Sequence, residues 1–414
     1  MEELYGMEYL KRKLSVKSSR VRTRYRYYDM KNRVRDFDIS TPPNLRSFQS
    51  VLGWCGKAVD TLGDRLIFRE FSNDNFNINE IFRMNNPDTF FDSAIQAALI
   101  ASCSFVYISN GEDGYPRLQV LDGASATGVI DPITGLLREG YAILERDKNK
   151  NPILEAYFLS GSTAFYRKGE RVPEVISTAV DYPLLVPVIF RPSAMREFGH
   201  SRISRACMDI VGSAMRTVKR SEISAEFYSF PQKYLLGTDP DMEPMEKWKA
   251  TMSSMIEISK DADGDKPVAG QFQQQSMTPH LDQLRMFAAL FAGETGLTMD
   301  DLGFATDNPS SAEAIKAAHE NLRLTARKAQ RNFGSGFLNV GFLAACLRDD
   351  FQYTRKQMYL TTPEWEPIFE PDSAMLSSIG DGVIKINQAV PGYLGGDNMR
   401  NLTGIPKSEE QSES

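Results

Sequence analysis

The chain has 414 residues, of which 42% are hydrophobic and 25% are charged, and its formal net charge is −6. A chain of this length can bury a substantial core, and we expect it to form two or three folding units. It contains no window of eighteen or more uncharged apolar residues, and its first residues lack the basic-then-apolar order of a secretory signal. We therefore exclude a membrane-spanning segment and expect a soluble protein made in a cytoplasm.

Residues 1–40 form a basic N-terminal arm. Between Lys11 and Arg35, eleven lysines and arginines stand against a single acid, Asp29, and tyrosines are interleaved among them. The favoured interpretation is a solvated helix or arm that packs against an acidic neighbour, because runs of charge usually lie on the surface. The alternative is a contact with nucleic acid through phosphates and stacking, or with a capsid surface. The candidate residues for that contact are Arg20, Arg22, Arg24 and Arg26.

Residues 41–200 combine helices with strands. The spacing of apolar residues predicts helices over residues 45–62, 77–83 and 87–101. From Phe105 to Pro192 the pattern changes to short alternating or β-branched runs separated by Gly, Asp, Asn and Pro, which is typical of antiparallel strands. The expected strands are 105–108, 118–121, 128–130, 141–144, 153–158, 164–166 and 186–190. This part of the chain is therefore α+β.

A helix, an insert and a returning helix follow. Residues 201–229 carry apolar side chains at helical spacing, and Pro231 ends that helix because it lacks the N–H that propagation needs. The insert, residues 230–278, contains a strand candidate around Val268 and is too small to bury a core alone, so we expect it to lean on a partner chain. Its soft apolar face is a candidate partner contact made of Met245, Trp248, Met252 and Met255. The chain returns through a helix over residues 279–296.

A loop over residues 297–309 precedes the longest helix. Ser310 and Glu313 have the spacing of a capping box, and periodic apolar positions continue to Leu347, which predicts a rod on the order of 50 Å long. The Gly334-Ser335-Gly336 step predicts a kink within it. Beyond it we expect one modest helix within residues 372–390, and a disordered Ser/Glu-rich end over residues 408–414.

Catalytic motifs are missing from the sequence. It has no phosphate-binding loop, no dinucleotide-binding glycine pattern, no nucleophile elbow and only three histidines. The four cysteines stand far apart, so we interpret them as buried thiols. Asp300, Asp301 and Asp307 could hold a cation, but their spacing matches no known metal loop, and capping or solvated carboxylates are favoured. We expect no catalytic residue, no metal and no cofactor, and hence no enzyme.

Three segments, taken in order, carry a resemblance to a known family. The first is the apolar strand over residues 182–190 followed by Gly199-His200-Ser201-Arg202-Ile203. The second is the stretch over residues 222–237, with Pro231 and Leu235-Leu236-Gly237. The third and best match is Leu302-Gly303 with Asn308-Pro309-Ser310-Ser311-Ala312-Glu313-Ala314-Ile315. Together they resemble the portal proteins of tailed bacteriophages, of the siphophage type, which form the ring at one capsid vertex through which DNA is packaged.

The resemblance implies an α+β, ring-forming oligomer of twelve chains with a fixed order of parts. After the arm (1–40) these are a β-rich and helical wing (41–200), a two-helix stem (201–229 and 279–296) and a small α/β clip (230–278). A channel loop (297–309), a long kinked helix that completes the wing (310–369) and a short helical crown with its tail (370–414) follow. The channel-loop residues are Thr298, Asp300, Asp301, Phe304, Asp307 and Asn308.

The function implied by the resemblance is a passive conduit for DNA packaging and ejection. Double-stranded DNA would be met without base readout. The terminase large subunit, which carries the motor ATPase in this family, and then a head completion or adaptor protein would dock on the ring. The major capsid and scaffolding proteins would hold it at the capsid vertex of the virion, after assembly in the host bacterial cytoplasm.

Two alternatives from other classes stay open. One is a metal-dependent nucleic-acid enzyme that uses Asp300, Asp301 and Asp307. The other is a capsid or tail structural protein that forms rings of another kind. For the favoured interpretation we expect that deleting residues 297–309 leaves rings intact but impairs DNA packaging or retention.

Overall fold

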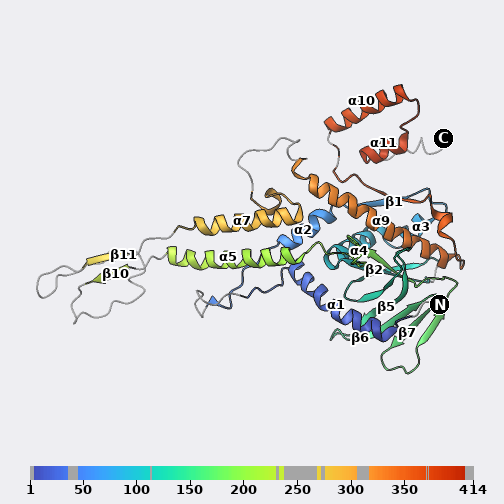
Figure 1. Cartoon of the computed structure of the whole chain (residues 1–414), viewed down its shortest axis with the longest axis horizontal. Helices are drawn as coiled ribbons and strands as arrows, with labels where there is room; N and C mark the ends of the chain where they lie inside the picture. Colours follow the sequence, from blue (N-terminus) through green and yellow to red (C-terminus); the bar gives the residue numbers. More distant parts are fainter. Residues whose placement is uncertain are drawn as a thin grey trace, which may run out of the picture.

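The computed structural model describes residues 4–35, 45–111, 114–229, 233–236, 268–271, 276–304, 317–369, 371 and 373–405. Figure 1 shows a body of helices and sheets from which two long helices, α5 (Arg205–Ser229) and α7 (Thr278–Thr295), project side by side. The expected α+β class is confirmed. No described helix is both long and apolar enough to cross a membrane.

The basic N-terminal segment is a helix, α1 (Met7–Tyr28), that lies against the body. Its apolar side is buried: Leu10 and Leu14 pack on Tyr141 in a small cluster of their own. Its first turns meet acidic groups, since Lys11 Nζ lies 2.9 Å from the Glu155 carboxylate and the Glu139 carboxylate accepts from the backbone N–H of residues 5 and 6. At its N-terminal end, α1 is therefore a helix packed on an acidic neighbour, as the favoured interpretation predicted.

Three helices follow: α2 (Trp54–Gly63), α3 (Ile78–Arg83) and α4 (Pro87–Ala101). The predicted helix over residues 45–62 is wrong in its first half, because the structure begins it only at Trp54. Phe48 and Val51 fit the helical spacing, but they are 41% and 55% exposed. Without a surface to bury them, a short helix gains too little to offset its nucleation cost.

Two antiparallel sheets form the β-rich region. The first, in the order β3-β2-β9, contains β2 (Cys103–Ser109), β3 (Arg117–Asp122) and β9 (Leu185–Ile189). The second runs in chain order through β4 (Ala126–Ile130), β5 (Leu137–Arg146), β6 (Pro152–Leu159), β7 (Ser162–Arg167) and β8 (Glu174–Ser177). All seven predicted strands are confirmed. The sequence missed β8, whose four residues are all exposed and therefore show no alternation of apolar and polar side chains.

The main core lies where α9 (Glu320–Arg348) packs on β9, α3 and a strand pair that the sequence also missed, β1 (Phe68–Ser72) with β12 (Thr362–Trp365). Rings from four elements meet there: Phe68 lies 4.2 Å from Phe91, 5.7 Å from Phe337 and 5.3 Å from Trp365, measured between ring centroids. Strands separated by nearly three hundred residues are thereby joined.

The described part of the long helix runs without interruption through the glycines where we predicted a kink. The structure gives these glycines another role, which is close packing. A Cβ at Gly334 would lie 2.6 Å from Pro363 Cγ, and a Cβ at Gly341 would overlap the Ile78 side chain. The predicted capping box, Ser310 and Glu313, lies outside the described residues.

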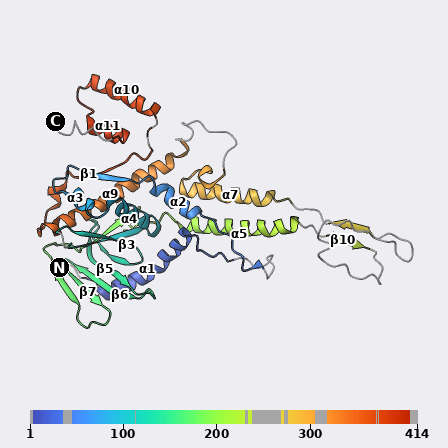
Figure 2. The same ribbon diagram turned by 180° about the vertical axis from the view of Figure 1, so that it is seen from behind.

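The chain then passes through η3 (Arg355–Met358) to α10 (Ser373–Ala389) and α11 (Gly396–Thr403). The first of these last two helices matches the predicted one, and the second was not predicted. Figures 1 and 2 show the pair on the side of α9, and α11 is tied to β1 by an ion pair between Arg400 and Glu70 at 2.8 Å. The predicted disordered end over residues 408–414 lies outside the described residues. All four cysteines are buried free thiols, as predicted.

Candidate functional site

The projecting hairpin is the most distinctive feature of the molecule. Helices α5 and α7 run antiparallel, and hydrogen bonds join them at three levels. From the body outward these are Ser204 Oγ to Glu294 Oε1 (2.8 Å), Thr217 Oγ1 to Gln283 Oε1 (2.9 Å) and Ser224 Oγ with His280 Nε2 (3.3 Å). At the far end, β10 (Lys233–Leu236) pairs with β11 (Val268–Gln271), where the sequence predicted a strand near Val268. The β10–β11 pair thus lies well away from the body.

The segment from Gly199 to Ile203 fixes the root of this hairpin. Gly199 has φ +71°, and a Cβ there would overlap the Phe190 carbonyl oxygen, so only glycine fits without strain. Ser201 Oγ donates to the Ile100 carbonyl at 2.6 Å, and the Arg202 N–H donates to the Leu99 carbonyl at 2.8 Å. These bonds hold residues 201–204 in a non-helical path along the end of α4. For this reason α5 begins at Arg205 and not at residue 201, as the sequence predicted.

Arg202 ties three elements together at this root. Its Nε donates to the Ala58 carbonyl at 3.1 Å and one terminal nitrogen donates to the Thr295 carbonyl at 2.5 Å, which links α2 and α7 to the start of α5. Burial lowers the pKa of Arg202 to about 10, so the guanidinium remains charged at neutral pH. From the sequence, Arg202 was identified only as part of a motif.

The outer face of α7 is apolar although it is exposed. The inner face is buried through Ala288, Phe291 and Ala292. On the opposite side, Met286 and Leu290 are 50% and 53% exposed, and Ala289 and Gly293 complete the same stripe. A helix that is apolar on both faces is normally covered on both.

The first half of the predicted channel loop is an ordered turn. Leu297 and Leu302 are buried, and η2 (Asp300–Leu302) lies between them. Asp301 Oδ2 accepts from the Thr298 N–H and hydroxyl, both at 2.9 Å, and lies 3.4 Å from His319 Nε2. Although burial raises the pKa of Asp301, these hydrogen bonds and the His319 ring lower it on balance.

The channel-loop candidates therefore fall into different settings. Thr298 and Asp301 cap a turn, Phe304 packs partly on the core, and Asp300 is exposed. Asp307 and Asn308 lie outside the described residues, as do the clip candidates Met245, Trp248, Met252 and Met255. A deletion of the whole segment 297–309 would also remove two core leucines, so our expectation that it leaves rings intact does not hold for residues 297–304.

A nuclease site has no support in the described part of the chain. Asp301 serves as the cap, which is the interpretation that the sequence favoured. No group of three or more His, Cys, Asp or Glu side chains among the described residues could hold a metal ion. His200 Nδ1 lies 3.1 Å from the Arg191 carbonyl within a turn and so has a local partner.

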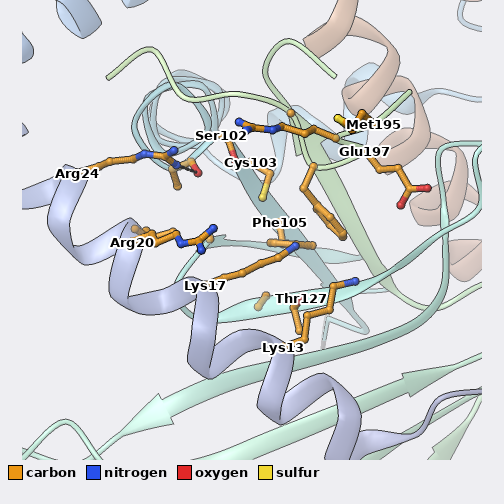
Figure 3. Close-up of a pocket in the computed structure, with 17 residues that line it drawn as sticks. Lys13, Lys17, Arg20, Arg24, Ser102, Cys103, Phe105, Thr127, Met195 and Glu197 are labelled. Atoms are coloured by element: carbon orange, nitrogen blue, oxygen red, sulfur yellow. Dashed lines mark hydrogen bonds between the residues drawn. The ribbon is translucent and has the colours of Figure 1, made fainter. Parts of the chain in front are cut away.

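The four basic candidates of α1 do not act as one set. Helical spacing separates Arg20 and Arg24, which line a pocket between α1 and the body, from Arg22 and Arg26, which do not line it. Of the four, only Arg24 is half-buried. Figure 3 shows Arg20 extending from α1 toward the centre of that pocket and Arg24 reaching toward Ser102. The sequence missed two further lining lysines, Lys13 and Lys17, although their spacing of four residues signals one face of a helix.

Comparisons with known proteins agree with the motifs. No established family profile matches the chain. The portal protein of Mycobacterium phage L5 is 24% identical over 339 residues, which is 75% of this chain and 68% of that protein. The portal protein of Mycobacterium phage D29 is 24% identical over 341 residues, which is 77% of this chain and 69% of that protein. These two relatives confirm the resemblance to portal proteins.

Similar solved structures come from a gene transfer agent. The virion of the native particle contains a chain with a TM-score of 0.46 and 13% identity, and the match covers 86% of this chain and 90% of that one. The neck of the native particle, computed with C12 symmetry, contains a chain with a TM-score of 0.45 and 11% identity at the same coverage. Scores of this size assign no fold.

Proposed function

We propose that this protein is the portal protein of a tailed bacteriophage, the ring at one capsid vertex through which double-stranded DNA enters and leaves. The observation that carries the proposal is the 24% identity with two portal proteins over 75% and 77% of the chain. The projecting α5–α7 hairpin supports it, because a stem with an insert at its tip suits a conduit better than a catalytic pocket. In this assignment the protein breaks no bond.

The ring contains twelve copies, and the stem is one of its contacts. The apolar outer stripe of α7, with Met286 and Leu290 half exposed, needs a cover that this chain does not supply within its described residues. A neighbouring copy in a closed ring presents the same surfaces to each subunit in turn and so can cover it. The exposed apolar residues of α10, Met375, Ile384 and Ile386, support a second contact at the crown.

The parts follow the order of the chain. The body forms the wing, α5 and α7 form the stem, and the insert at the tip forms the clip, on which the terminase large subunit docks first and a head completion or adaptor protein docks later. Met245, Trp248, Met252 and Met255 are the proposed clip contacts. The major capsid and scaffolding proteins hold the ring at the virion vertex after assembly in the host cytoplasm.

DNA passes the ring without base readout. The channel loop ends in Asp307 and Asn308, and with Asp300, whose side chain is exposed, it offers the duplex a weakly repulsive surface along which a polyanion slides. The exposed Arg22 and Arg26 are the remaining candidates for a DNA or capsid contact on α1. Thr298, Asp301 and Phe304 hold the base of the loop in place.

Electron microscopy of the purified full chain tests the ring, and we expect closed rings with a central hole. Discrete monomers at every salt concentration would contradict the proposal. Deleting this gene from the phage distinguishes a portal from another ring-forming structural protein. Without a portal we expect heads that contain no DNA, whereas loss of a tail protein leaves filled heads. Cleavage of DNA by the pure protein with Mg²⁺ or Mn²⁺ would favour the nuclease alternative instead.

A further inference from the structure

A strongly basic pocket separates α1 from the segment 195–199 that leads into the stem. The cavity measures about 410 Å³. Among the described residues that line it, one carboxylate, Glu197, faces five cations: Lys13, Lys17, Arg20, Arg24 and Arg196. In Figure 3, Lys13, Lys17 and Arg20 extend from α1 toward Phe105 and Thr127, and Glu197 lies on the far side. The pocket therefore has a surplus of four positive charges.

The cations are held in place by neutral groups. Lys13 Nζ donates to the Gly128 carbonyl at 2.7 Å, and Arg24 donates to the Ala101 carbonyl at 3.0 Å. The ammonium groups of Lys13 and Lys17 share one aromatic ring, lying 5.0 and 4.6 Å from the centroid of Phe198. Cation–π contacts and carbonyls orient these cations, but they do not cancel their mutual repulsion.

Burial disfavours the charged forms of three of these groups. Burial, followed by the charge of Lys17, lowers the pKa of Lys13 to about 8. Desolvation also lowers the pKa of Lys17 and of Arg24. Each of these shifts measures how much the charged form is disfavoured in the folded chain, and an anion in the pocket would reverse them.

We propose that this pocket binds the phosphate group of a small solute, with Lys13, Lys17 and Arg20 as its cationic ligands. A phosphate matches the surplus charge better than a single carboxylate does, and arginine and lysine together suit its oxygens. The cavity is of the size that admits small molecules, whereas a recess between a helix and a sheet does not admit a duplex. The inference does not depend on the portal function.

Binding would join two parts of the molecule. Lys13, Lys17 and Arg20 belong to α1, whereas Phe198 and Arg196 belong to the segment that ends at Gly199, the root of the stem. A phosphate between them adds a link from the N-terminal helix to that root. The ligand is therefore a structural one, whose binding raises the stability of the folded chain.

Thermal unfolding of the full chain tests the proposal, with sodium phosphate or pyrophosphate compared with sodium chloride at equal ionic strength. We expect the phosphate salts to raise the Tm by about 2–4 °C at saturation. Lys17→Gln and Arg20→Gln should abolish that rise. Both variants relieve repulsion, so they should fold. Arg22→Gln, an exposed arginine of the same helix outside the pocket, is the matched control and should keep the rise.

Three outcomes would overturn the assignment. The first is an equal Tm in phosphate and chloride, and the second is a rise that persists in both Lys17→Gln and Arg20→Gln. The third is that duplex DNA, at the same phosphate concentration, displaces pyrophosphate in isothermal titration. The phosphate that the pocket binds would then be that of the DNA backbone and not that of a small solute. One pyrophosphate bound per chain, unaffected by the duplex, would support it.

Discussion

Single residues at the root of the hairpin carry constraints that their types alone do not reveal. Gly199 adopts φ +71° directly against the Phe190 carbonyl, and Arg202 satisfies two carbonyls from two other helices. The motif that resembles portal proteins thus has a physical basis in this chain. It fixes where α5 leaves the body.

We predict that Gly199→Ala destabilises the chain much more than a matched substitution at Gly392. Gly392 has nearly the same φ, +74°, but open space around its Cα. The control Gly392→Ala should cost only the left-handed strain, about 1–2 kcal/mol. Gly199→Ala adds the overlap with Phe190 and should cost about 3–5 kcal/mol. Urea unfolding measures both, and equal losses would contradict the overlap.

Lys13 gives a prediction about pH. Its pKa falls from an ordinary 10.5 to about 8 in the folded chain, mainly through burial and Lys17, while Glu197 and Glu139 act in the opposite direction. Below about pH 8 both states hold the proton, so the cost of the buried charge is fully present. Between about pH 8 and 10.5 the unfolded chain binds more protons, so this cost is released and stability rises with pH.

Lys13→Met removes that titration. The free energy of unfolding of the variant relative to the natural chain should therefore be most favourable below about pH 8, and the advantage should shrink toward about pH 10.5. Urea unfolding of both chains across this range, without phosphate, measures the difference. A difference that stays constant with pH would show that Lys13 is not perturbed.

At the residue scale, the local role of a side chain was easier to predict from the sequence than the residues that it contacts. The sequence identified buried cysteines and a capping role for Asp301, because these follow from local composition. It could not separate Arg20 from Arg22, since this requires knowing which face of α1 meets the body. It missed the pocket for a similar reason: Phe198 approaches Lys17 only after nearly two hundred intervening residues have folded.

At the scale of elements, α9 shows how glycines permit close packing within a long helix. Gly334 and Gly341 have no room for a Cβ, because Pro363 and Ile78 occupy that space. Gly336 lies in the same helix, yet a Cβ there would find ordinary contacts at 3.4 Å or more with Val188. Their neighbours therefore distinguish the three positions.

We predict opposite effects for these positions. Gly341→Ala and Gly334→Ala should each destabilise the chain by about 1–3 kcal/mol through overpacking. Gly336→Ala should be neutral or stabilise by up to about 1 kcal/mol, because alanine favours the helix. Thermal unfolding of the three variants measures the order. Equal behaviour of all three would favour the predicted kink over packing as the reason for the glycines.

The channel loop gives a second prediction for an element. Removing residues 305–309 leaves Leu297, Leu302 and the Thr298–Asp301 cap in place, so we expect an unchanged Tm and a defect in packaging or retention of DNA. Removing residues 297–304 takes two leucines from the core, at about 2–3 kcal/mol each, and should lower the Tm strongly. Calorimetry and packaging assays on both deletions test this. Normal virus yield from the 305–309 deletion would contradict a role for the loop.

The accuracy of the predicted elements follows the strength of the local signal. Helices with a buried stripe, such as α4 and α5, and strands with alternation, such as β6, were predicted nearly to their bounds. The exposed β8 and the remote pair β1–β12 gave no such signal. The helix predicted over residues 45–62 was wrong only before Trp54, because the apolar residues there have the right spacing but no surface to pack against.

At the scale of the whole molecule, apolar surface remains where the single chain cannot bury it. Helix α7 projects from the body in Figures 1 and 2, and exposed apolar side chains lie on its outer stripe and on α10. Exposed stripes of this kind mark interaction sites in soluble proteins. Most helices and strands could be predicted from the sequence, but the faces that stay uncovered could not, since they depend on tertiary packing.

The last prediction concerns the assembly. The double variant Met286→Glu with Leu290→Glu places two like charges on the α7 stripe. In the single chain the Met286 side chain is 50% exposed and the Leu290 side chain is 53% exposed. The folded chain should tolerate them, because its core does not include these side chains, so the Tm of the monomer should change by less than about 2 °C. A neighbour packed on the stripe would have to bury both charges, at several kcal/mol per subunit contact. We therefore expect monomers from the variant under conditions in which the natural chain, in the proposed assembly, forms rings.

Ile133→Glu is the matched control. Ile133 is 92% exposed in the turn between β4 and β5, and the substitution replaces an apolar side chain by a charged one away from α7. It should leave ring formation intact. Light scattering gives the mass and electron microscopy the shape of each variant. Rings from the α7 double variant would place the contact between copies elsewhere, whereas loss of rings from Ile133→Glu as well would mean that added charge alone, and not the stem stripe, prevents assembly.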